Sequence, residues 1–350
     1  MKHLTYEELN DTLVTESKNM KSSIRKFVLR TGFAAVLMTC LSLAVKCHAQ
    51  VIKVHIYPSA VNLVPEGITA DNRTGKIYVS SIAQQKIVVI GQSGLVSDFI
   101  PGNTEGFGEG LGMKVDARKN ILWALSNKRK ENLFTSMIHG FDLKTGKVLN
   151  RFVLQDTIPH LFNDLVIHET GELLITDTYA SILYKYAPAT RELTEWIPAG
   201  KFQYPNGITS GGRKDLYIAT YGNGILHIDL QTRKIQPLPG FKDSSYAFGL
   251  DGLVYRDGAL FGVYNAKEYN TNAVIRYNLD RSGKLIVSET VLDSGNLNFK
   301  DPTTAVILND VLYVIANSHL DQFNRNKETV QGIEKALSPL TLLLYPIKDR

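Results

Sequence analysis

Apolar and polar residues alternate along this chain in short runs, separated by turns rich in Gly, Asn, Asp and Pro. Such runs are typical of β-strands. One sequence motif recurs: a turn, an apolar run, a second turn, and a strand that ends in small or hydroxyl residues. One copy runs from Pro65 to Ser81, and others begin at Phe162 and Pro205. A period of roughly 40 to 50 residues is typical of propellers and solenoids.

The sequence contains six copies of this motif. The residues that open them are Glu66, Gly112, Asn163, Asn206, Asp251 and Thr303, with spacings of 46, 51, 43, 45 and 52 residues. Each interval holds several strand-like runs and almost no amphipathic helical pattern. The sequence therefore predicts an all-β, six-bladed β-propeller of four-stranded blades around a central channel. We expect the run Val51–Tyr57 to pair with the last blade near Leu342–Pro346 and to close the ring.

Three segments are poor in strand patterns, and we expect them to form loops on the propeller faces: Lys128–Ser136, Lys242–Ala247 and Asn317–Ala336. The last segment leads into Gly332–Leu337, which could form one helical turn. No Ser/Pro/Gly-rich linker interrupts the repeats. Residues 50–350 are therefore predicted to form a single domain.

The first 49 residues have the anatomy of a secretory signal peptide. A basic region from Lys21 to Arg30 precedes the apolar run Phe33–Val45 and a small-residue exit that ends at Ala49. The apolar run is shorter than the about 20 residues that a membrane span needs. We therefore expect cleavage after Ala49, a secreted or periplasmic product and no stable membrane insertion after cleavage. Met20 could be the true start, and a retained N-terminal anchor is the alternative.

Cysteine content and charge exclude several kinds of chemistry. Cys40 and Cys47 are the only cysteines, so a product cleaved after Ala49 has no disulfide, thiolate metal site or cysteine nucleophile. The formal net charge of the whole chain is +5, and without residues 1–49 it falls to +2, from 32 Lys/Arg and 30 Asp/Glu. Lys128–Lys130 is the only tight basic cluster. No basic stripe suited to nucleic acid is present.

Equivalent positions of propeller blades converge on the central channel. The repeat-opening residues would therefore bring Glu66, Asn163, Asn206 and Asp251 to one channel mouth. Two carboxylates and two carboxamides suit a hard divalent cation, first of all Ca²⁺, with Mg²⁺, Mn²⁺ and Zn²⁺ left open. Asn-Gly and Asp-Gly are also ordinary turn dipeptides. Recurrence at equivalent repeat positions favours the metal site, because turn chemistry alone would scatter such residues.

Four short motifs in this order and spacing resemble the senescence-marker/gluconolactonase/regucalcin family: Pro65-Glu66-Gly67, Phe162-Asn163-Asp164, Pro205-Asn206-Gly207-Ile208 and Asp251-Gly252-Leu253. This family lies within a wider group of calcium-dependent six-bladed propellers, which includes paraoxonases and strictosidine-synthase-like proteins. The resemblance implies that Glu66, Asn206 and Asp251 bind a central divalent cation with Asn163 beside it. It also implies hydrolysis of a small-molecule lactone or ester, with Asp251 taking part in proton transfer.

The chain departs from the family pattern in two places. Leu161 stands where sugar lactonases commonly carry an arginine that contacts substrate hydroxyls. The stretch Gly110–Met113 lacks the histidine of paraoxonase-like members. The predicted site is therefore more apolar than in either group. Its candidate substrate-binding residues are Leu161, Tyr179, Tyr221 and Phe248, although aromatic residues near blade tips more often pack between sheets.

His160, three residues before Asn163, is a candidate catalytic base at the channel rim. The sequence contains no serine-hydrolase, zincin, dinucleotide or P-loop motif. A second interpretation is a non-catalytic propeller that binds a small ligand or a partner and holds a structural calcium ion. The sequence leaves the substrate and the oligomeric state open.

Overall fold

The computed structural model describes residues 52–242, 249–265, 272–325 and 337–348. The signal peptide predicted at residues 1–49 and the candidate residue Phe248 lie outside this described part. Within it, 24 strands form six four-stranded antiparallel sheets. No helix of these ranges is long and apolar enough to span a membrane.

The first three sheets follow the chain in order, and each contains four consecutive strands. Blade 1 contains β2 (Pro65–Asp71), β3 (Lys76–Ser81), β4 (Ile87–Ile90) and β5 (Val96–Ile100). Blade 2 contains β6 (Glu109–Asp116), β7 (Ile121–Lys130), β8 (Leu133–Asp142) and β9 (Val148–Asp156). Blade 3 contains β10 (Phe162–Ile167), β11 (Leu173–Asp177), β12 (Ile182–Ala187) and β13 (Glu192–Ile197).

The last sheet combines both ends of the described chain, whereas the two before it are again consecutive. Blade 4 contains β14 (Pro205–Ser210), β15 (Asp215–Thr220), β16 (Gly224–Asp229) and β17 (Ile235–Pro237). Blade 5 contains β18 (Leu250–Arg256), β19 (Ala259–Tyr264), β20 (Ala273–Leu279) and β21 (Ile286–Ser294). Blade 6 contains β22 (Ala305–Leu308), β23 (Val311–Ile315), β24 (Leu340–Pro346) and β1 (Lys53–Tyr57).

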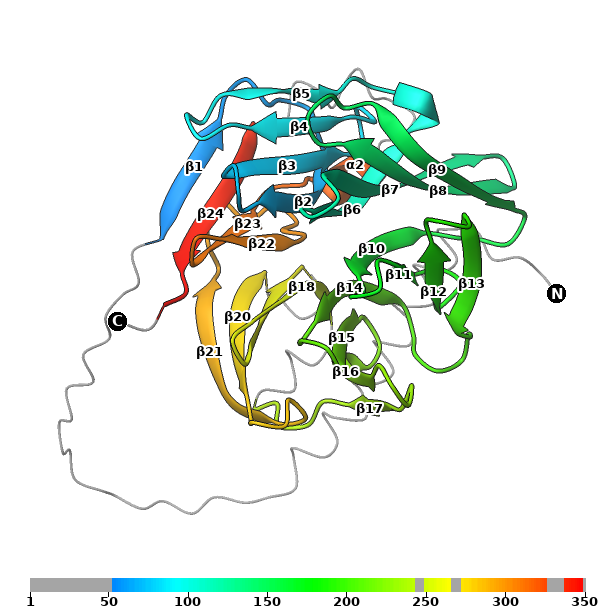
Figure 1. Cartoon of the computed structure of the whole chain (residues 1–350). Helices are drawn as coiled ribbons and strands as arrows, with labels where there is room; N and C mark the ends of the chain where they lie inside the picture. The colour runs from blue at the N-terminus through cyan, green and yellow to red at the C-terminus, as the bar shows by residue number, and fades with distance from the viewer. Residues whose placement is uncertain (1–51, 243–248, 266–271, 326–336, 349–350) are drawn as a thin grey trace, which may run out of the picture. The chain divides into compact units, whose positions relative to one another are not determined.

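The six sheets form a ring. The first strand of each blade contacts the first strand of the next, in the order β2, β6, β10, β14, β18 and β22, and β22 contacts β2 again. These six strands surround the centre of the molecule in Figure 1, with the last strands on the outside. The predicted six-bladed propeller is confirmed.

The ring is closed as the sequence predicted. β1 pairs antiparallel with β24, from Lys53 opposite Leu344 to Tyr57 opposite Leu340. The first described strand therefore supplies the outer strand of the last blade. Because this pairing joins the two ends of the ring, the fold depends on contacts that are very distant in sequence.

The hydrophobic core lies between neighbouring blades. Because side chains alternate along each strand, every inner strand has apolar residues for the sheets on both sides. Ile68 and Val79 of blade 1, for example, pack with Leu342 of blade 6. Five further buried clusters join the other neighbouring pairs in the same way.

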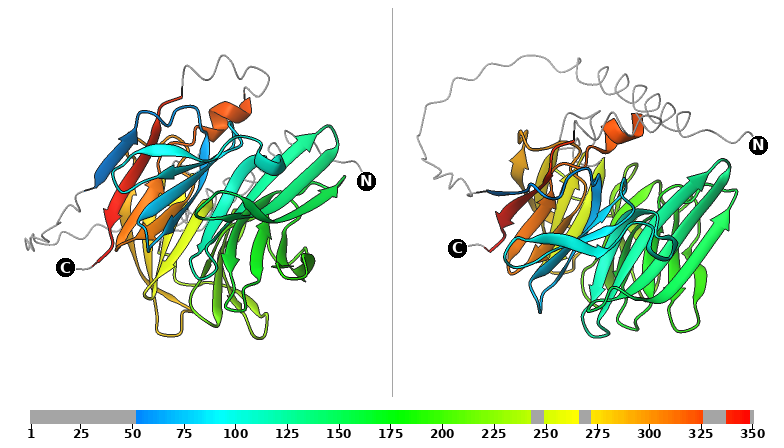
Figure 2. Two further views of the ribbon diagram at one scale, coloured as in Figure 1. Left: turned by 45° about the horizontal axis from the view of Figure 1, so that its top comes forward. Right: turned by 90° about the horizontal axis from the view of Figure 1, so that it is seen from above.

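Two segments differ from the loops that the sequence predicted. Lys128–Ser136 belongs to a long hairpin, because β7 and β8 continue their pairing to Lys130 opposite Leu133. Alternating polar side chains on this exposed hairpin hid its strand pattern. The segment after β23 contains the helix α2 (Leu320–Arg325), which lies on one face of the ring in Figure 2. The helical turn predicted at Gly332–Leu337 and most of Lys242–Ala247 lie outside the described residues.

Candidate metal-binding and active site

Each of the first five inner strands contains the same irregularity near its start. The register with the second strand shifts after Pro65, Gly110, Phe162, Pro205 and Leu250. A β-bulge of this kind re-aims the side chains beside it, and bulges are frequent next to functional sites. Here the bulge fixes which residue of each blade faces the channel mouth.

The register identifies the equivalent residues from blade to blade. The residues that follow the shift point are Glu66, Leu111, Asn163, Asn206 and Asp251. The blade 2 position is therefore held by Leu111, and the expectation that Gly112 takes this place is wrong by one residue. In blade 6, the hydroxyl of Thr303 donates to the carbonyl oxygen of Glu66 at 3.0 Å.

The four oxygen-bearing side chains expected at the mouth line one small central cavity: Glu66, Asn163, Asn206 and Asp251. Each is only 5–7% exposed. Asp164, which the sequence analysis noted beside Asn163 without giving it a role, lines the same cavity. The remaining space has room for about one water-sized sphere. This space suits an ion or a water molecule and not a whole organic substrate.

Glycines permit the close approach of neighbouring blades at this cavity. A Cβ atom at Gly67 would lie 2.0 Å from the carbonyl oxygen of Leu111, and one at Gly207 would lie 2.6 Å from that of Asp251. Both carbonyl groups belong to the position equivalent to Glu66 in the next blade. The glycine of each turn motif is therefore required by packing between blades.

Two buried hydroxyl groups tie these blades together. Ser80 accepts from the amide of Gly67 at 2.8 Å and donates to the carbonyl of Leu111 at 2.8 Å. Thr176, on β11, accepts from the amide of Asp164 at 3.1 Å and donates to the carbonyl of Asn206 at 2.7 Å. The hydroxyl residues at the ends of the second strands therefore fix the backbone that carries the candidate ligands.

Asp251 has the most elaborate surroundings of the four. Burial is the main cause that raises its pKa to about 7, and Asp164 and Asp301 act in the same direction, whereas hydrogen bonds from Asn265 and Asn206 oppose the shift. The amide of Asn265 donates to Asp251 Oδ2. Tyr221 Oη in turn donates to Asn265 Oδ1 at 2.7 Å. Asp251 is thus held by a chain of polar side chains.

Glu66 is buried beside other acids. Burial, followed by the charges of Asp251 and Asp164, raises its pKa well above the usual range of a glutamate. Lys114 Nζ lies 3.7 Å from Asp164 Oδ1 and offsets part of the negative charge. Three carboxyl groups around one cavity, with Lys114 as the ammonium group beside them in the described part of the chain, would favour a bound cation.

Asn163 is fixed by a hydroxyl of its own blade that is in turn bonded to the next blade. Its amide donates to the hydroxyl of Thr178 at 3.0 Å, and that hydroxyl donates to the carbonyl of Pro205 at 2.7 Å. The side-chain oxygen of Asn163 is therefore the atom that can serve as a ligand. Among the residues that the structure describes, no three His, Cys, Asp or Glu side chains form a metal cluster. A metal site here depends on amide oxygens as well as carboxylates.

His160 is not among the residues that line the cavity. It is buried, its Nδ1 donates to Asp177 Oδ2 at 2.6 Å, and its Nε2 lies 3.9 Å from Asp156 Oδ2. Burial lowers the pKa of His160, but the hydrogen bond and charge of Asp177, with Asp156, outweigh it and raise the pKa overall. These contacts hold the imidazole between an acid of blade 2, Asp156, and an acid of blade 3, Asp177.

The candidate substrate residues take different places. Leu161 packs against a mouth cluster of apolar residues: Val64, Ile82, Leu111 and Phe323. Tyr221 contacts Asp251 through Asn265. Tyr179 follows the end of β11 and is half-buried, outside the cavity lining. The mouth cluster places α2, through Phe323, against the side of the channel mouth that carries Leu111.

Asn265 is the site residue that the sequence analysis missed. It follows β19 directly, as Tyr221 follows β15 and Thr178 follows β11. A comparison of the residues that follow each second strand would therefore have singled it out. The repeat-opening motif alone does not contain Asn265.

No protein-family model matches this chain, and no curated protein matches its sequence significantly. Solved structures match its fold. A gluconolactonase from Xanthomonas campestris is 15% identical, with 91% of this chain and 99% of that chain covered and a TM-score of 0.57. The calcium-binding protein regucalcin from Agrobacterium tumefaciens is 18% identical over 84% of this chain and 94% of its own, with a TM-score of 0.55.

The same fold also occurs in a different type of enzyme. A virginiamycin B lyase from Staphylococcus aureus is 18% identical over 76% of this chain and 82% of its own, with a TM-score of 0.52. The chain therefore has the six-bladed fold of gluconolactonase- and regucalcin-like propellers, and the predicted likeness to this group is confirmed at the level of the fold. Identities this low show the fold alone.

Proposed function

We propose that this protein is a secreted or periplasmic, divalent-metal-dependent hydrolase of lactones or related esters. The observation that carries the proposal is the central cavity, which gathers Glu66, Asn163, Asn206 and Asp251 from four blades. Buried acids and amides around a space of ion size are not explained by apolar packing of the core. Their placement supports a bound cation.

The donor chemistry fits a hard cation. Carboxylate and carboxamide oxygens are typical ligands of Ca²⁺, which also accepts water or substrate oxygens in its flexible shell. Mg²⁺, Mn²⁺ and Zn²⁺ remain the alternatives. When bound, a divalent cation supplies Lewis acidity toward a carbonyl group and a template for the attacking water.

In this proposal, Asp251 accepts the proton of the attacking water. Its raised pKa of about 7 arises mainly from burial, and a carboxylate of this basicity is matched to proton transfer near neutral pH. Asn265 and Tyr221 hold the carboxylate in one orientation. Glu66, Asn163 and Asn206 would complete the ligand set. His160 would act as a base through Nε2, because its Nδ1–H is bonded to Asp177.

The mouth favours substrates with an apolar part. Leu111 belongs to the apolar mouth cluster and Leu161 packs against it. The side chain at the ring position of Leu111 carries no ligand oxygen. The mouth is thus apolar on the side of Leu111. We propose lactones or esters with an apolar substituent in preference to sugar lactones.

The test is hydrolysis of a panel of lactones and aryl esters by the purified protein, after chelation and again with each divalent metal restored. We expect metal-dependent turnover, and Asp251→Asn should lower kcat by roughly 10²–10⁴-fold, the usual contribution of general base catalysis. Asp257→Asn, on an exposed hairpin, is the matched control and should keep full activity.

Two results would separate this proposal from the binding propeller. Turnover that survives complete chelation, or that survives Asp251→Asn, would contradict the assigned site. Absence of turnover on the whole panel, together with a calcium-dependent rise of the melting temperature, would favour a non-catalytic propeller with a structural ion.

A further inference from the structure

A second and larger cavity lies on the other face of the propeller, between blades 3 and 4. Its volume is about 220 Å³, and it is partly open to solvent. Its walls are apolar and include Val166, Leu174, Leu216 and Leu230. Val166 lies three residues beyond Asn163 on β10, and the rim residue His168 lies about 17 Å along the chain from Asn163, at the rise of an extended strand. The cavity is therefore separate from the central site.

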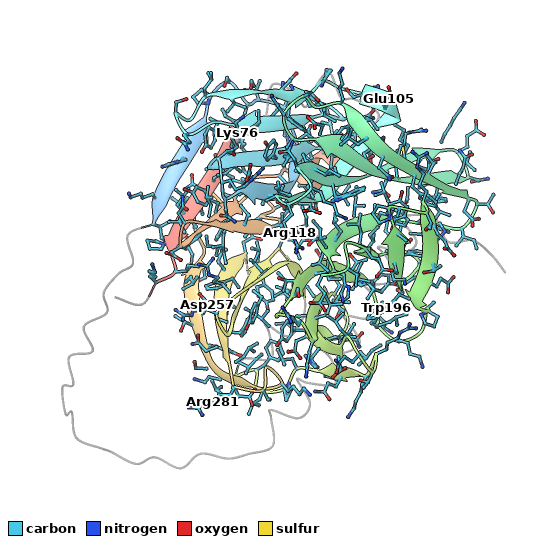
Figure 3. The ribbon with its side chains drawn as sticks, viewed as in Figure 1. Lys76, Glu105, Arg118, Trp196, Asp257 and Arg281 are labelled. Atoms are coloured by element: carbon cyan, nitrogen blue, oxygen red, sulfur yellow. The ribbon has the colours of Figure 1, made fainter. Side chains whose placement is uncertain are left out.

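The rim of this cavity carries more positive than negative groups. Arg118, His168, Glu169 and Arg213 all line it. Arg118 comes from the β6–β7 hairpin of blade 2, and its place near the centre of the ring is visible in Figure 3. It therefore reaches a cavity whose walls belong to the next two blades.

The acids near the rim already have partners. Glu169 Oε2 lies 3.6 Å from Arg213 Nε, and Glu172 Oε1 lies 2.9 Å from Lys185 Nζ. Asp116 Oδ1 accepts the backbone amide of Arg118 at 3.1 Å and so belongs to its own turn. Within the described ranges, no ion pair joins Arg118 to an acid.

Lys119, which follows Arg118 in the same hairpin, adds a further positive charge near blade 3. A Cβ atom at Gly171 would lie 2.6 Å from Lys119 Nζ, so this ammonium group rests against the β10–β11 turn of blade 3. The hairpin of blade 2 thus leans over blade 3 and brings Arg118 and Lys119 with it. A local excess of positive charge beside apolar walls attracts anions that have an apolar part.

We infer that this cavity binds a small amphipathic carboxylate. The hydrocarbon part would lie against Ile167 and Leu230, the partly exposed apolar residues of the lining. The carboxylate would accept hydrogen bonds from Arg118 and Arg213, whose planar guanidinium groups match carboxylate geometry. An apolar pocket with a few convergent polar groups is the usual form of a small-molecule site. The inference does not depend on the proposed hydrolase function.

The test is titration calorimetry of hexanoate into the purified protein. Acetate, which lacks the apolar part, and hexan-1-ol, which lacks the charge, are the ligand controls. We expect one hexanoate per chain and weaker binding of both controls. Absence of heat with hexanoate, or binding of acetate or hexan-1-ol as tight as that of hexanoate, would overturn the inference.

Variants test the assigned residues. Arg118→Gln should raise the Kd for hexanoate roughly tenfold, as expected for the loss of a charge-assisted hydrogen bond. Glu169→Gln should lower the Kd, because it releases Arg213 from its ion pair. Arg281→Gln, on an exposed arginine at the outer edge of the ring (Figure 3), is the matched control and should leave the Kd unchanged. An unchanged Kd in Arg118→Gln with Arg213→Gln would contradict the site.

Discussion

At the scale of single residues, His160 shows how a histidine near a candidate site can serve the fold. It is buried, bonded to Asp177 at 2.6 Å and close to Asp156. Its pKa in the folded protein is raised because these two acids outweigh the opposing effect of burial. The positive imidazole therefore stabilises the folded state through its contacts with blades 2 and 3.

The sign of the pH dependence follows from this shift. A histidine whose folded pKa exceeds its unfolded value of about 6.5 contributes its full stability below that value, and loses it as the pH rises through the folded pKa. We expect the difference in unfolding free energy between the parent and His160→Asn to be largest near pH 5.5 and to shrink toward pH 8.5. Urea unfolding across this range measures it.

The surface residue His55 provides the matched control, since His55→Gln removes an imidazole that is exposed on β1. This variant should show a small difference from the parent at every pH. A difference for His160→Asn that stays constant or grows with rising pH would show that the protonated imidazole is not the stabilising form.

The residue scale also shows which parts of the site the sequence could predict. Glu66, Asn163, Asn206 and Asp251 recur at one repeat position, so periodicity alone brought them to one mouth. The sequence did not predict Leu111 at this position, because Gly112 beside it fits the turn motif better. Only strand register distinguishes the two. The link between Asn265 and Asp251 is a side-chain contact, and no periodic pattern contains such a contact.

At the scale of strands and blades, the contact between neighbouring inner strands is set by glycine. Gly207→Ala would place a Cβ atom 2.6 Å from the carbonyl oxygen of Asp251 and 2.7 Å from the amide nitrogen of Leu253. Both atoms belong to the β18 backbone, so β14 and β18 would have to move apart. We expect a loss of about 1–3 kcal/mol in unfolding free energy, the usual cost of overpacking.

Gly91→Ala is the comparison for this substitution, because its nearest atom would lie at an ordinary 3.8 Å and Gly91 is not in the left-handed region. Its effect should stay within about 0.5 kcal/mol, as for other surface positions. Equal losses in both variants, measured by urea unfolding, would mean that chain entropy and not blade contact determines the cost at Gly207.

The strength of the apolar–polar alternation determines which strands and helices the sequence could predict. Strands that face two neighbouring blades have strong alternation, so all six inner strands were predictable. The Lys128–Ser136 hairpin extends beyond the packed core, where charged side chains are tolerated, and its pattern was therefore weak. Helix α2 has only six residues and is held by Phe323 in the mouth cluster, so its stability comes from tertiary packing.

At the scale of the whole molecule, the central cavity joins blades that are distant in sequence, so a bound ion would stabilise the closed ring. A ligand that binds only the folded state adds about 2.7 kcal/mol at a concentration 100 times its Kd. We expect calcium to raise the melting temperature of the parent protein above its value in chelator. Glu66→Gln should remove most of this increase, because it removes one of the carboxylate ligands.

Without metal, the order of stability should change. Glu66 is buried beside Asp251 and Asp164, and these acids disfavour its charged form. The neutral amide of Glu66→Gln avoids this repulsion while it keeps the shape of the side chain. In chelator the variant should therefore melt at the same temperature as the parent or higher, and in calcium it should melt lower. A variant that melts lower under both conditions would show that Glu66 acts through packing alone. If the Glu66 carboxylate binds a cation, the order of the two melting temperatures must differ between calcium and chelator.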